Sequence, residues 1–257
     1  MKLTPITTTP DLYPDEIRRI IEGARVFDSS SSPEAKVLFI DRDDGYFLKI
    51  GKSRALENEA RLGEYFHKNG LAPEILFYSS EESDFMLSRK ARGLDLTNKI
   101  YLNEPYRLAV KMGEVLRSLH ELDFSGCPEK DRMKSYFELM EKNAEKDAFD
   151  LSFGSFQTKR EAYEAALRAK EILKSDTLIH GDFCLPNIIF DGWNFSSFID
   201  LGNAGVGDRH VDIFWGAWTL NFNLKTDKYR DIFFSAYGKD RIESDAIAAV
   251  SAVEIFG

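Results

Sequence analysis

Hydrophobic and polar positions alternate in the first third of the chain, which is typical of β-strands. The clearest case is a pair of apolar runs separated by Asp43-Asp44-Gly45, because an Asp-Gly turn between two such runs is a strong β-hairpin signal. A helical pattern follows and stops at Asn69-Gly70, a usual helix end. The pattern predicts strands at 35–40, 46–50, 75–78 and 85–87 and a helix at 54–68.

Beyond Gly93 the hydrophobic positions recur mainly at helical spacing. Short apolar runs between polar turns, at 178–179, 188–190 and 198–199, indicate short strands among the helices. Helices are predicted at 106–122, 131–143 and 158–174 and near Arg209, Asp227 and Ser244. The expected fold class is therefore α+β in two lobes. Residues 1–92 form a small antiparallel β-rich N-terminal lobe and residues 93–257 a larger, mainly helical C-terminal lobe.

Composition narrows the class of protein. Of 257 residues, 43% are hydrophobic and 30% charged, as in ordinary globular domains. No apolar run approaches the ~20 residues of a membrane-spanning helix, and the first residues lack the apolar core of a secretion signal. The net charge of −9 disfavours binding to nucleic acid or anionic lipid. Two cysteines make a disulfide framework unexpected and favour the cytoplasm.

The stretch from His180 to Asp212 carries the most specific chemistry. Asp182 and Asn187 bracket a loop between two predicted strands, and Asp200 follows the next strand. Adjacent strands of such a hairpin would bring all three side chains to one edge. Carboxylate and amide oxygens are ligands that suit Mg²⁺, which also keeps water and phosphate ligands.

The spacing of these residues matches the kinase pattern His-x-Asp-x-x-x-x-Asn followed by Asp-x-Gly. In that pattern one carboxylate orients and deprotonates the attacking hydroxyl group. The amide and the second carboxylate hold Mg²⁺ on the phosphates. We interpret His180, Asp208 and Asp212 as braces of the loop rather than as catalysts.

A kinase-type site also needs a lysine for the α- and β-phosphates and a glutamate to hold it. Lys49 lies in the predicted return strand, and the following helix offers Glu57, Glu59 and Glu64. Only Glu59 falls on the inward face, which is defined by Leu56, Leu62, Gly63 and Phe66. Because a carboxylate on an apolar stripe is costly unless it is paired, Glu59 is the expected partner of Lys49.

Taken together, these motifs resemble those of the aminoglycoside O-phosphotransferases, a small-molecule branch of the protein-kinase-like fold. The resemblance is closest to the 3′-phosphotransferases that act on kanamycin and neomycin, and it runs from about residue 20 to the end. It rests on the segments His180–Ile188, Phe198–Gly202 with Asp208 and Asp212, Ser32–Val37, and Leu119–Pro128.

The resemblance implies a role for each matching position. Asp182 corresponds to the catalytic base, Asn187 and Asp200 to the Mg²⁺ ligands, and Lys49 with Glu59 to the ion pair at the ATP phosphates. The loop 29–33, with Ser32, corresponds to the cover over the β- and γ-phosphates. Backbone atoms of Arg89 to Ala91 correspond to the linker that binds adenine.

The sequence departs from this family in the C-terminal lobe. Where the family has an acidic pair that faces the cationic antibiotic, an ungapped count places Phe222 and Asn223. Glu254 matches one acid of the family's chain end. Replacement acids are available at Glu141, Glu145, Asp147 and Asp150. The predicted substrate ligands are Asp150 and Glu254. Trp215 and Trp218, three residues apart, fit core positions better than a substrate platform.

The predicted function is therefore Mg²⁺-dependent transfer of the ATP γ-phosphate to a hydroxyl group of a small cationic molecule, first of all the 3′-hydroxyl of an aminoglycoside. Such an enzyme would confer antibiotic resistance and would need no nucleic acid, membrane or obligate protein partner. Two alternatives stay open: a kinase for choline, an amino alcohol or a sugar derivative, and a catalytically silent nucleotide-binding protein. A protein kinase is disfavoured because the chain contains no Ala-Pro-Glu.

Overall fold

The structure is a computed structural model that describes residues 3–30 and 35–257. The chain divides into two compact units. The first unit comprises Met1–Gly93 together with Ser196–Gly202, and the second comprises Leu94–Phe195 and Asn203–Gly257. The segment Ser196–Gly202 thus packs with residues that lie more than one hundred positions earlier in the sequence. Ser32, the predicted phosphate-covering residue, lies outside the described residues.

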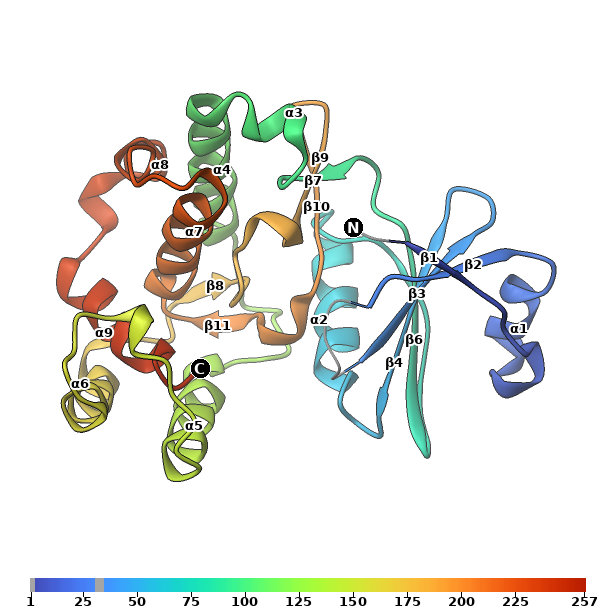
Figure 1. Ribbon diagram of the computed structural model, residues 1–257, viewed down its shortest axis with the longest axis horizontal. Helices are drawn as coiled ribbons and strands as arrows, with labels where there is room; N and C mark the ends of the chain where they lie inside the picture. Colours follow the sequence, from blue (N-terminus) through green and yellow to red (C-terminus); the bar gives the residue numbers. More distant parts are fainter. Residues whose placement is uncertain (1–2, 31–34) are drawn as a thin grey trace. The chain divides into compact units, whose positions relative to one another are not determined.

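The first unit is built on a six-stranded antiparallel sheet (Figure 1) with the order β1-β2-β3-β4-β6-β5. Its strands are β1 (Thr4–Ile6), β2 (Arg25–Asp28), β3 (Lys36–Asp41), β4 (Tyr46–Lys52), β5 (Ile75–Ser80) and β6 (Ser83–Arg89). A 3-10 turn η1 (Pro10–Leu12) and two helices, α1 (Asp15–Ile21) and α2 (Glu57–Lys68), accompany the sheet.

The two faces of this sheet have different partners because side chains alternate along each strand. Leu38, Ile40 and Leu48 pack with Ile17 and Ile21 of α1 in one fully buried cluster. On β4, Lys49 follows Leu48 and therefore lies on the other face, opposite Met86 of β6. Met86 packs with Leu56 and Ala60, at the start of α2. The register of β4 thus places Lys49 on the face that α2 covers.

A buried carboxylate fixes the loop between β4 and α2. Asp84, with no exposed surface, accepts hydrogen bonds from the backbone N–H groups of Arg54 and Leu56, both at 2.7 Å, and from the Tyr78 hydroxyl at 3.2 Å. Burial raises the pKa of Asp84, but the hydrogen bonds from Ser80, Leu56 and Arg54 outweigh burial, and the net pKa is lowered. This contact sets where α2 begins, and with it the position of the glutamates on α2.

The second unit is mainly helical. Its helices are α3 (Lys99–Leu102), α4 (Pro105–His120), α5 (Arg132–Glu145), α6 (Lys159–Ile172), α7 (Arg209–Leu224), α8 (Arg230–Tyr237) and α9 (Ser244–Glu254), with 3-10 turns at Leu151–Phe153, Leu185–Asn187 and Lys239–Arg241. Its strands are β7 (Leu94–Asp95), β8 (Thr177–Ile179), β9 (Ile188–Asp191), β11 (Gly205–Gly207) and the start of β10 (Asn194–Phe198).

Two small sheets support the loops of this unit. Strands β8 and β11 pair with each other, and β9 lies between β7 and β10 in a separate three-stranded sheet. Helices α4, α7 and α8 contact one another (Figure 1), and α9 packs on α6 and α7. Gly113 permits the close approach of α4 and α8, because a Cβ atom there would lie 2.6 Å from the carbonyl oxygen of Phe233.

Most elements expected from the sequence are present with ends shifted by a few residues. The hydrophobic pattern did not indicate the first thirty residues, where β1, α1 and β2 form, or the short α3 and β11. In the described part of the chain, no helix is both long and apolar enough to cross a membrane.

We expect Asp84→Ala to lower the free energy of unfolding by about 2–4 kcal/mol, because the buried backbone N–H of Leu56 loses its acceptor and the N–H of Arg54 keeps only the Ser80 hydroxyl oxygen. Urea unfolding followed by circular dichroism measures the change. Glu82→Ala, a nearby exposed acid, serves as the control and is expected to stay within about 0.5 kcal/mol of the wild type. A loss for Asp84→Ala no larger than that of the control contradicts the assigned role.

Candidate functional site

Three charged side chains meet within the first unit. The Lys49 ammonium lies 2.5 Å from Oε1 of Glu59 and also contacts Oδ1 of Asp200. The Lys49 and Glu59 side chains are less than one fifth exposed, whereas that of Asp200 is 47% exposed. The expected Lys49–Glu59 pairing is confirmed. The participation of these residues in nucleotide and metal binding stays a prediction.

These charges alter the proton affinity of the lysine. Burial lowers the pKa of Lys49, but the negative charges and hydrogen bonds of Asp200 and Glu59 outweigh burial and raise it to about 12. Lys49 is therefore a permanently charged ammonium at neutral pH. A fixed cation of this kind suits the binding of phosphate oxygens and does not suit a general base.

Asp200 has an unusual backbone conformation for a residue with a side chain. Its φ of 59° lies in the left-handed region, which Asp tolerates better than most residues. The segment before it is anchored on the turn that follows α2, since the Phe198 N–H donates to the carbonyl oxygen of Leu71 at 2.7 Å. After it, the Gly202 carbonyl oxygen accepts a hydrogen bond from Nδ2 of Asn58 at 2.9 Å. Asp200 is thus held from both sides.

Within the second unit, Asp182 and Asn187 lie together in the loop between β8 and β9. Nδ2 of Asn187 donates to Oδ2 of Asp182 at 2.8 Å and to its carbonyl oxygen at 3.1 Å. Asp182 is half-buried and Asn187 is 6% exposed. Asn187 therefore orients the carboxylate of Asp182 while its own Oδ1 points to no donor among the described residues.

The backbone of this loop is held by Asp212, a carboxylate on α7 with no exposed surface. Oδ2 of Asp212 accepts from the His180 N–H at 2.7 Å, and Oδ1 accepts from the Gly181 N–H at 2.8 Å. Gly181 has φ 78°, and a Cβ atom there would lie 1.9 Å from the Asn203 carbonyl oxygen, so only glycine fits. Asp212 is thus a brace, as expected, and not a catalytic group.

A second row of buried side chains supports Asp212. Nε2 of His120 lies 3.1 Å from Oδ2 of Asp212, and Nδ1 lies 2.9 Å from the Tyr237 hydroxyl. Because the carboxylate accepts, Nε2 carries the ring proton and Nδ1 accepts from Tyr237. Burial lowers the pKa of His120 more than the carboxylate of Asp212 raises it. His120 is therefore neutral and in one tautomer.

Glu254, a predicted substrate ligand, is a buried acid with 7% exposure. Its Oε1 accepts hydrogen bonds from the Tyr136 hydroxyl at 2.7 Å and from Nε1 of Trp215 at 3.0 Å. Burial raises the pKa of Glu254 to about 7; the two hydrogen bonds and Arg132 lower it, and the charge of Asp182 raises it. Sequence reasoning missed both partners: it did not single out Tyr136, and it interpreted Trp215 as a core residue.

The second predicted substrate ligand, Asp150, is exposed and accepts from the Ser152 N–H at 2.9 Å, so its carboxylate caps a short turn. Two other candidate acids have lysine partners. Glu141 lies 2.5 Å from Nζ of Lys170, and Asp147 lies 2.6 Å from Nζ of Lys159. The structure thus gives a polar contact to each of these three acids, and Glu145 is exposed.

The predicted adenine-binding residues lie where β6 ends. Arg89 is exposed, and its Nε lies 2.8 Å from Oε2 of Glu74. Its backbone N–H donates to the Glu74 carbonyl oxygen at 2.9 Å. Ala91 follows in a loop and is half-buried. The side chain of Arg89 is thus turned to Glu74, and adenine binding by backbone atoms of Arg89 to Ala91 stays a prediction.

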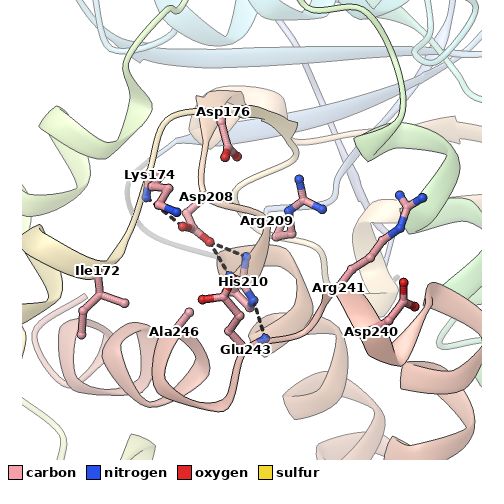
Figure 2. A pocket seen from close by; sticks show the side chains of 10 residues that line it. All are labelled: Ile172, Lys174, Asp176, Asp208, Arg209, His210, Asp240, Arg241, Glu243 and Ala246. Atoms are coloured by element: carbon pink, nitrogen blue, oxygen red, sulfur yellow. Dashed lines mark hydrogen bonds and ion pairs between the residues drawn. The ribbon is translucent and has the colours of Figure 1, made fainter.

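A polar pocket of about 190 Å³ lies at the starts of α7 and α9. Figure 2 shows the side chains that line it. Its centre is Asp208, which caps α7 and accepts hydrogen bonds from the backbone of Lys174 and from the backbone and ring of His210. Nε2 of His210 in turn accepts from the Glu243 N–H at 3.0 Å. These contacts join three helices, so Asp208 is a structural brace, as the sequence indicated.

The chain is similar in sequence to known phosphotransferases. The profile of the phosphotransferase enzyme family matches residues 24–250. A probable aminoglycoside 3′-phosphotransferase of Lactococcus lactis subsp. lactis (strain IL1403) is 49% identical over 249 residues, or 95% of each chain. An aminoglycoside 3′-phosphotransferase of Niallia circulans is 31% identical over 78% of this chain and 79% of its own.

Solved structures show the same fold. The crystal structure of an aminoglycoside 3′-phosphotransferase of type VIII aligns with a TM-score of 0.75 over 96% of each chain, at 18% identity. An aminoglycoside phosphotransferase of Streptomyces rimosus, solved with ADP and streptomycin, aligns with a TM-score of 0.70 over 86% of this chain and 90% of its own, at 19% identity. The α+β, protein-kinase-like fold expected from the sequence is confirmed.

The chain belongs to the phosphotransferase enzyme family. The resemblance to aminoglycoside phosphotransferases inferred from its motifs is confirmed, and so is the expectation that it is an enzyme. The residue roles within the site remain predictions.

We expect Glu254→Gln to change the pH dependence of stability. With a pKa raised from 4.5 to about 7, folded Glu254 keeps its proton where the unfolded chain has lost it, so wild-type stability falls as pH rises through this window. The loss is up to about 3 kcal/mol, and Gln does not incur it. Urea unfolding from pH 4 to 8 compares the two proteins.

The difference between the two proteins in free energy of unfolding at each pH gives the contribution of Glu254, because all other titrating groups are shared. Glu171→Gln, which changes an exposed acid, is the control and is expected to follow the wild-type curve. Parallel curves for wild type and Glu254→Gln would show that the pKa of Glu254 is not raised in the folded protein.

Proposed function

We propose that the protein transfers the γ-phosphate of ATP, with Mg²⁺, to a hydroxyl group of a small cationic acceptor, most directly the 3′-hydroxyl of an aminoglycoside. The observation that carries this proposal is the 49% identity to a probable aminoglycoside 3′-phosphotransferase over 95% of both chains. Asp182, oriented by Asn187 in a loop braced by Asp212, supplies the carboxylate that this reaction needs.

In this proposal Asp182 accepts a hydrogen bond from the acceptor hydroxyl and takes its proton as the phosphate is transferred. Positioning and electrostatic stabilisation account for most of the catalysis of phosphoryl transfer. Lys49, kept charged by Glu59 and Asp200, binds the phosphate oxygens of the nucleotide. The backbone at Arg89 to Ala91 binds adenine.

The residues present are compatible with Mg²⁺. Oδ1 of Asn187 is available because Nδ2 makes both hydrogen bonds of the amide to Asp182. Asp200 has an accessible carboxylate that already contacts a cation, the Lys49 ammonium. When bound, the ion would neutralise charge on the phosphates, and two protein oxygens are few enough to leave room for water and phosphate ligands. No group of three or more His, Cys, Asp or Glu side chains suited to a metal occurs among residues 3–30 and 35–257.

One observation favours an acceptor other than an aminoglycoside. Glu141 and Asp147 are paired with lysines, and Asp150 caps a turn, so none of the three is an unengaged acid for a polycationic antibiotic. This favours, as the second candidate, a smaller or less charged amino alcohol. We place the reaction in the cytoplasm, with which the two buried free thiols, Cys127 and Cys184, are compatible.

We expect Asp182→Asn to lower kcat by at least ~100-fold, about 2.7 kcal/mol in the barrier, because the amide cannot accept the hydroxyl proton. ATP binding is expected to persist. A coupled ADP-release assay measures turnover with kanamycin, neomycin, amikacin, choline and amino alcohols as acceptors. Asp227→Asn, a change of an exposed loop acid, is the control. Near-normal turnover by Asp182→Asn refutes the catalytic assignment, and turnover only with the simple alcohols selects the second candidate.

We expect Asp200→Asn to weaken binding of Mg·ATP by at least ~10-fold, because the removed charge-assisted contact is worth about 1.5–3 kcal/mol. Asn tolerates the left-handed backbone conformation at this position, so the local fold is retained. Calorimetry with a non-hydrolysable ATP analogue, with and without Mg²⁺, separates metal-dependent from metal-independent binding. Equal affinity of variant and wild type in the presence of Mg²⁺ excludes Asp200 as a ligand.

A further inference from the structure

The polar pocket of Figure 2 is formed by residues of the second unit other than Asp182 and Asn187. It encloses about 190 Å³ between the end of α6, the start of α7, the turn Lys239–Arg241 and the start of α9. A space of this size suits a small molecule. Besides the structural Asp208, its lining carries charged side chains of both signs: Lys174, Arg209, Arg241, Asp176, Asp240 and Glu243.

Two of the charged groups in the pocket are already engaged by the protein. Oδ1 of Asp208 accepts hydrogen bonds from the N–H and ring of His210 at 2.9 and 2.7 Å, and Oδ2 accepts from the Lys174 N–H at 2.8 Å. Nη1 of Arg241 forms an ion pair with Glu121 at 3.0 Å. Asp208 and Arg241 are therefore balanced without a ligand.

Arg209 is a half-buried cation that forms no ion pair with a carboxylate in the described part of the chain. Its Nη2 donates to Oγ1 of Thr177 at 3.1 Å, and this neutral hydroxyl in turn donates to Asp176. A second hydroxyl near Arg209, that of Tyr237, is also neutral, because burial raises its pKa to about 12 although the charges of Arg209 and Arg241 lower it. A partly desolvated guanidinium binds carboxylate oxygens in a bidentate manner, so Arg209 points to an anionic group on a ligand.

Two acids of the lining also lack a counter-charge. Asp240 and Glu243 are exposed, and neither carboxylate has an ion-pair or hydrogen-bond partner among the residues that the structure describes. The backbone of Glu243 is fixed, since its N–H donates to Nε2 of His210 at 3.0 Å. These carboxylates disfavour a dianion such as phosphate and favour a ligand that also carries a positive group. Free charges of both signs thus face the same space: Arg209 and the exposed Lys174, and Asp240 and Glu243.

We propose that this pocket binds a small zwitterion, a molecule with one carboxylate and one ammonium group, as in amino acids. Arg209 holds the carboxylate, with Lys174 as a second cation at the rim, and the ammonium group lies toward Asp240 and Glu243. A ligand of zero net charge meets both kinds of free charge and adds none to the pocket. The inference goes beyond the proposed function and does not depend on it.

Calorimetry at constant ionic strength tests the proposal with three zwitterions of increasing length, glycine, β-alanine and 4-aminobutyrate. At least one of them is expected to bind with a Kd below about 1 mM. Acetate, propionate and butyrate lack the ammonium group, and methyl-, ethyl- and propylammonium lack the carboxylate. Each of these analogues is expected to bind at least ~10-fold more weakly than the matching zwitterion, because one charge-assisted contact is missing.

The contribution of Arg209 is measured by substitution. Arg209→Gln removes the charge but keeps an N–H donor for Thr177, and it is expected to raise the Kd of the best zwitterion at least ~10-fold. Arg168→Gln makes the same change at an exposed arginine of α6 that is not part of the lining, and it is expected to leave the Kd unchanged.

A double variant measures the contribution of the acids. Asp240→Asn with Glu243→Gln is expected to raise the Kd of the zwitterion about 3- to 10-fold, because the ammonium group loses its counter-charges. The same variant is expected to bind the simple carboxylates no more weakly than the wild type does. Asp227→Asn with Glu138→Gln changes two exposed acids outside the lining and is the matched control.

A Kd above about 1 mM for all three zwitterions overturns the inference, and so does an unchanged Kd in Arg209→Gln. Equal affinity for a zwitterion and its simple carboxylate also overturns it and identifies a site for anions alone. Circular dichroism checks that each variant is folded. If Arg209→Gln is not, Arg209→Lys takes its place; it keeps the charge, loses the bidentate geometry and is expected to raise the Kd about 2- to 10-fold. No result bears on the proposed function, because neither nucleotide nor acceptor is present.

Discussion

The arrangement of the second unit depends on one buried carboxylate. Asp212 stands on α7 and accepts hydrogen bonds from two consecutive backbone N–H groups, those of His180 and Gly181, which immediately precede Asp182. A buried carboxylate is costly unless its oxygens are fully hydrogen-bonded, and here both oxygens are. Because the donors belong to the loop, any movement of the loop would leave the buried Asp212 carboxylate without these two hydrogen bonds.

The need to hydrogen-bond the buried Asp212 carboxylate also explains why certain residues outside the loop lie where they do. His120 provides Asp212 with a third donor and is itself held by Tyr237, so helices α4, α7 and α8 are joined through polar contacts inside their packing. Gly181 completes the arrangement, since its left-handed backbone and the nearby Asn203 carbonyl oxygen leave no room for a side chain. The half-buried Asp182 thereby keeps one orientation although it lies in a loop.

The sequence predicted those parts of the structure that local rules determine. The spacing of apolar residues on α2 selected Glu59 over its two neighbours as the partner of Lys49, because an acid on a buried stripe must be paired. The first thirty residues were missed, since β1 gains its stability from pairing with β2, and β2 from pairing with β3, rather than from an alternating pattern of their own. The partners of Glu254 were missed for the same reason: Tyr136 and Trp215 come from α5 and α7, and only packing brings them to α9.

The charges in the second unit bear on how it could recognise a cation. A fully ionised acidic cluster would hold a polycation strongly but would repel the phosphates of the nucleotide. Here Glu254 has a pKa near neutrality, two other acids are balanced by lysines, and α7 presents aromatic rings. Aromatic faces attract ammonium groups without carrying a net charge. The aromatic rings on α7 therefore offer a contact for a cation without adding negative charge to the second unit.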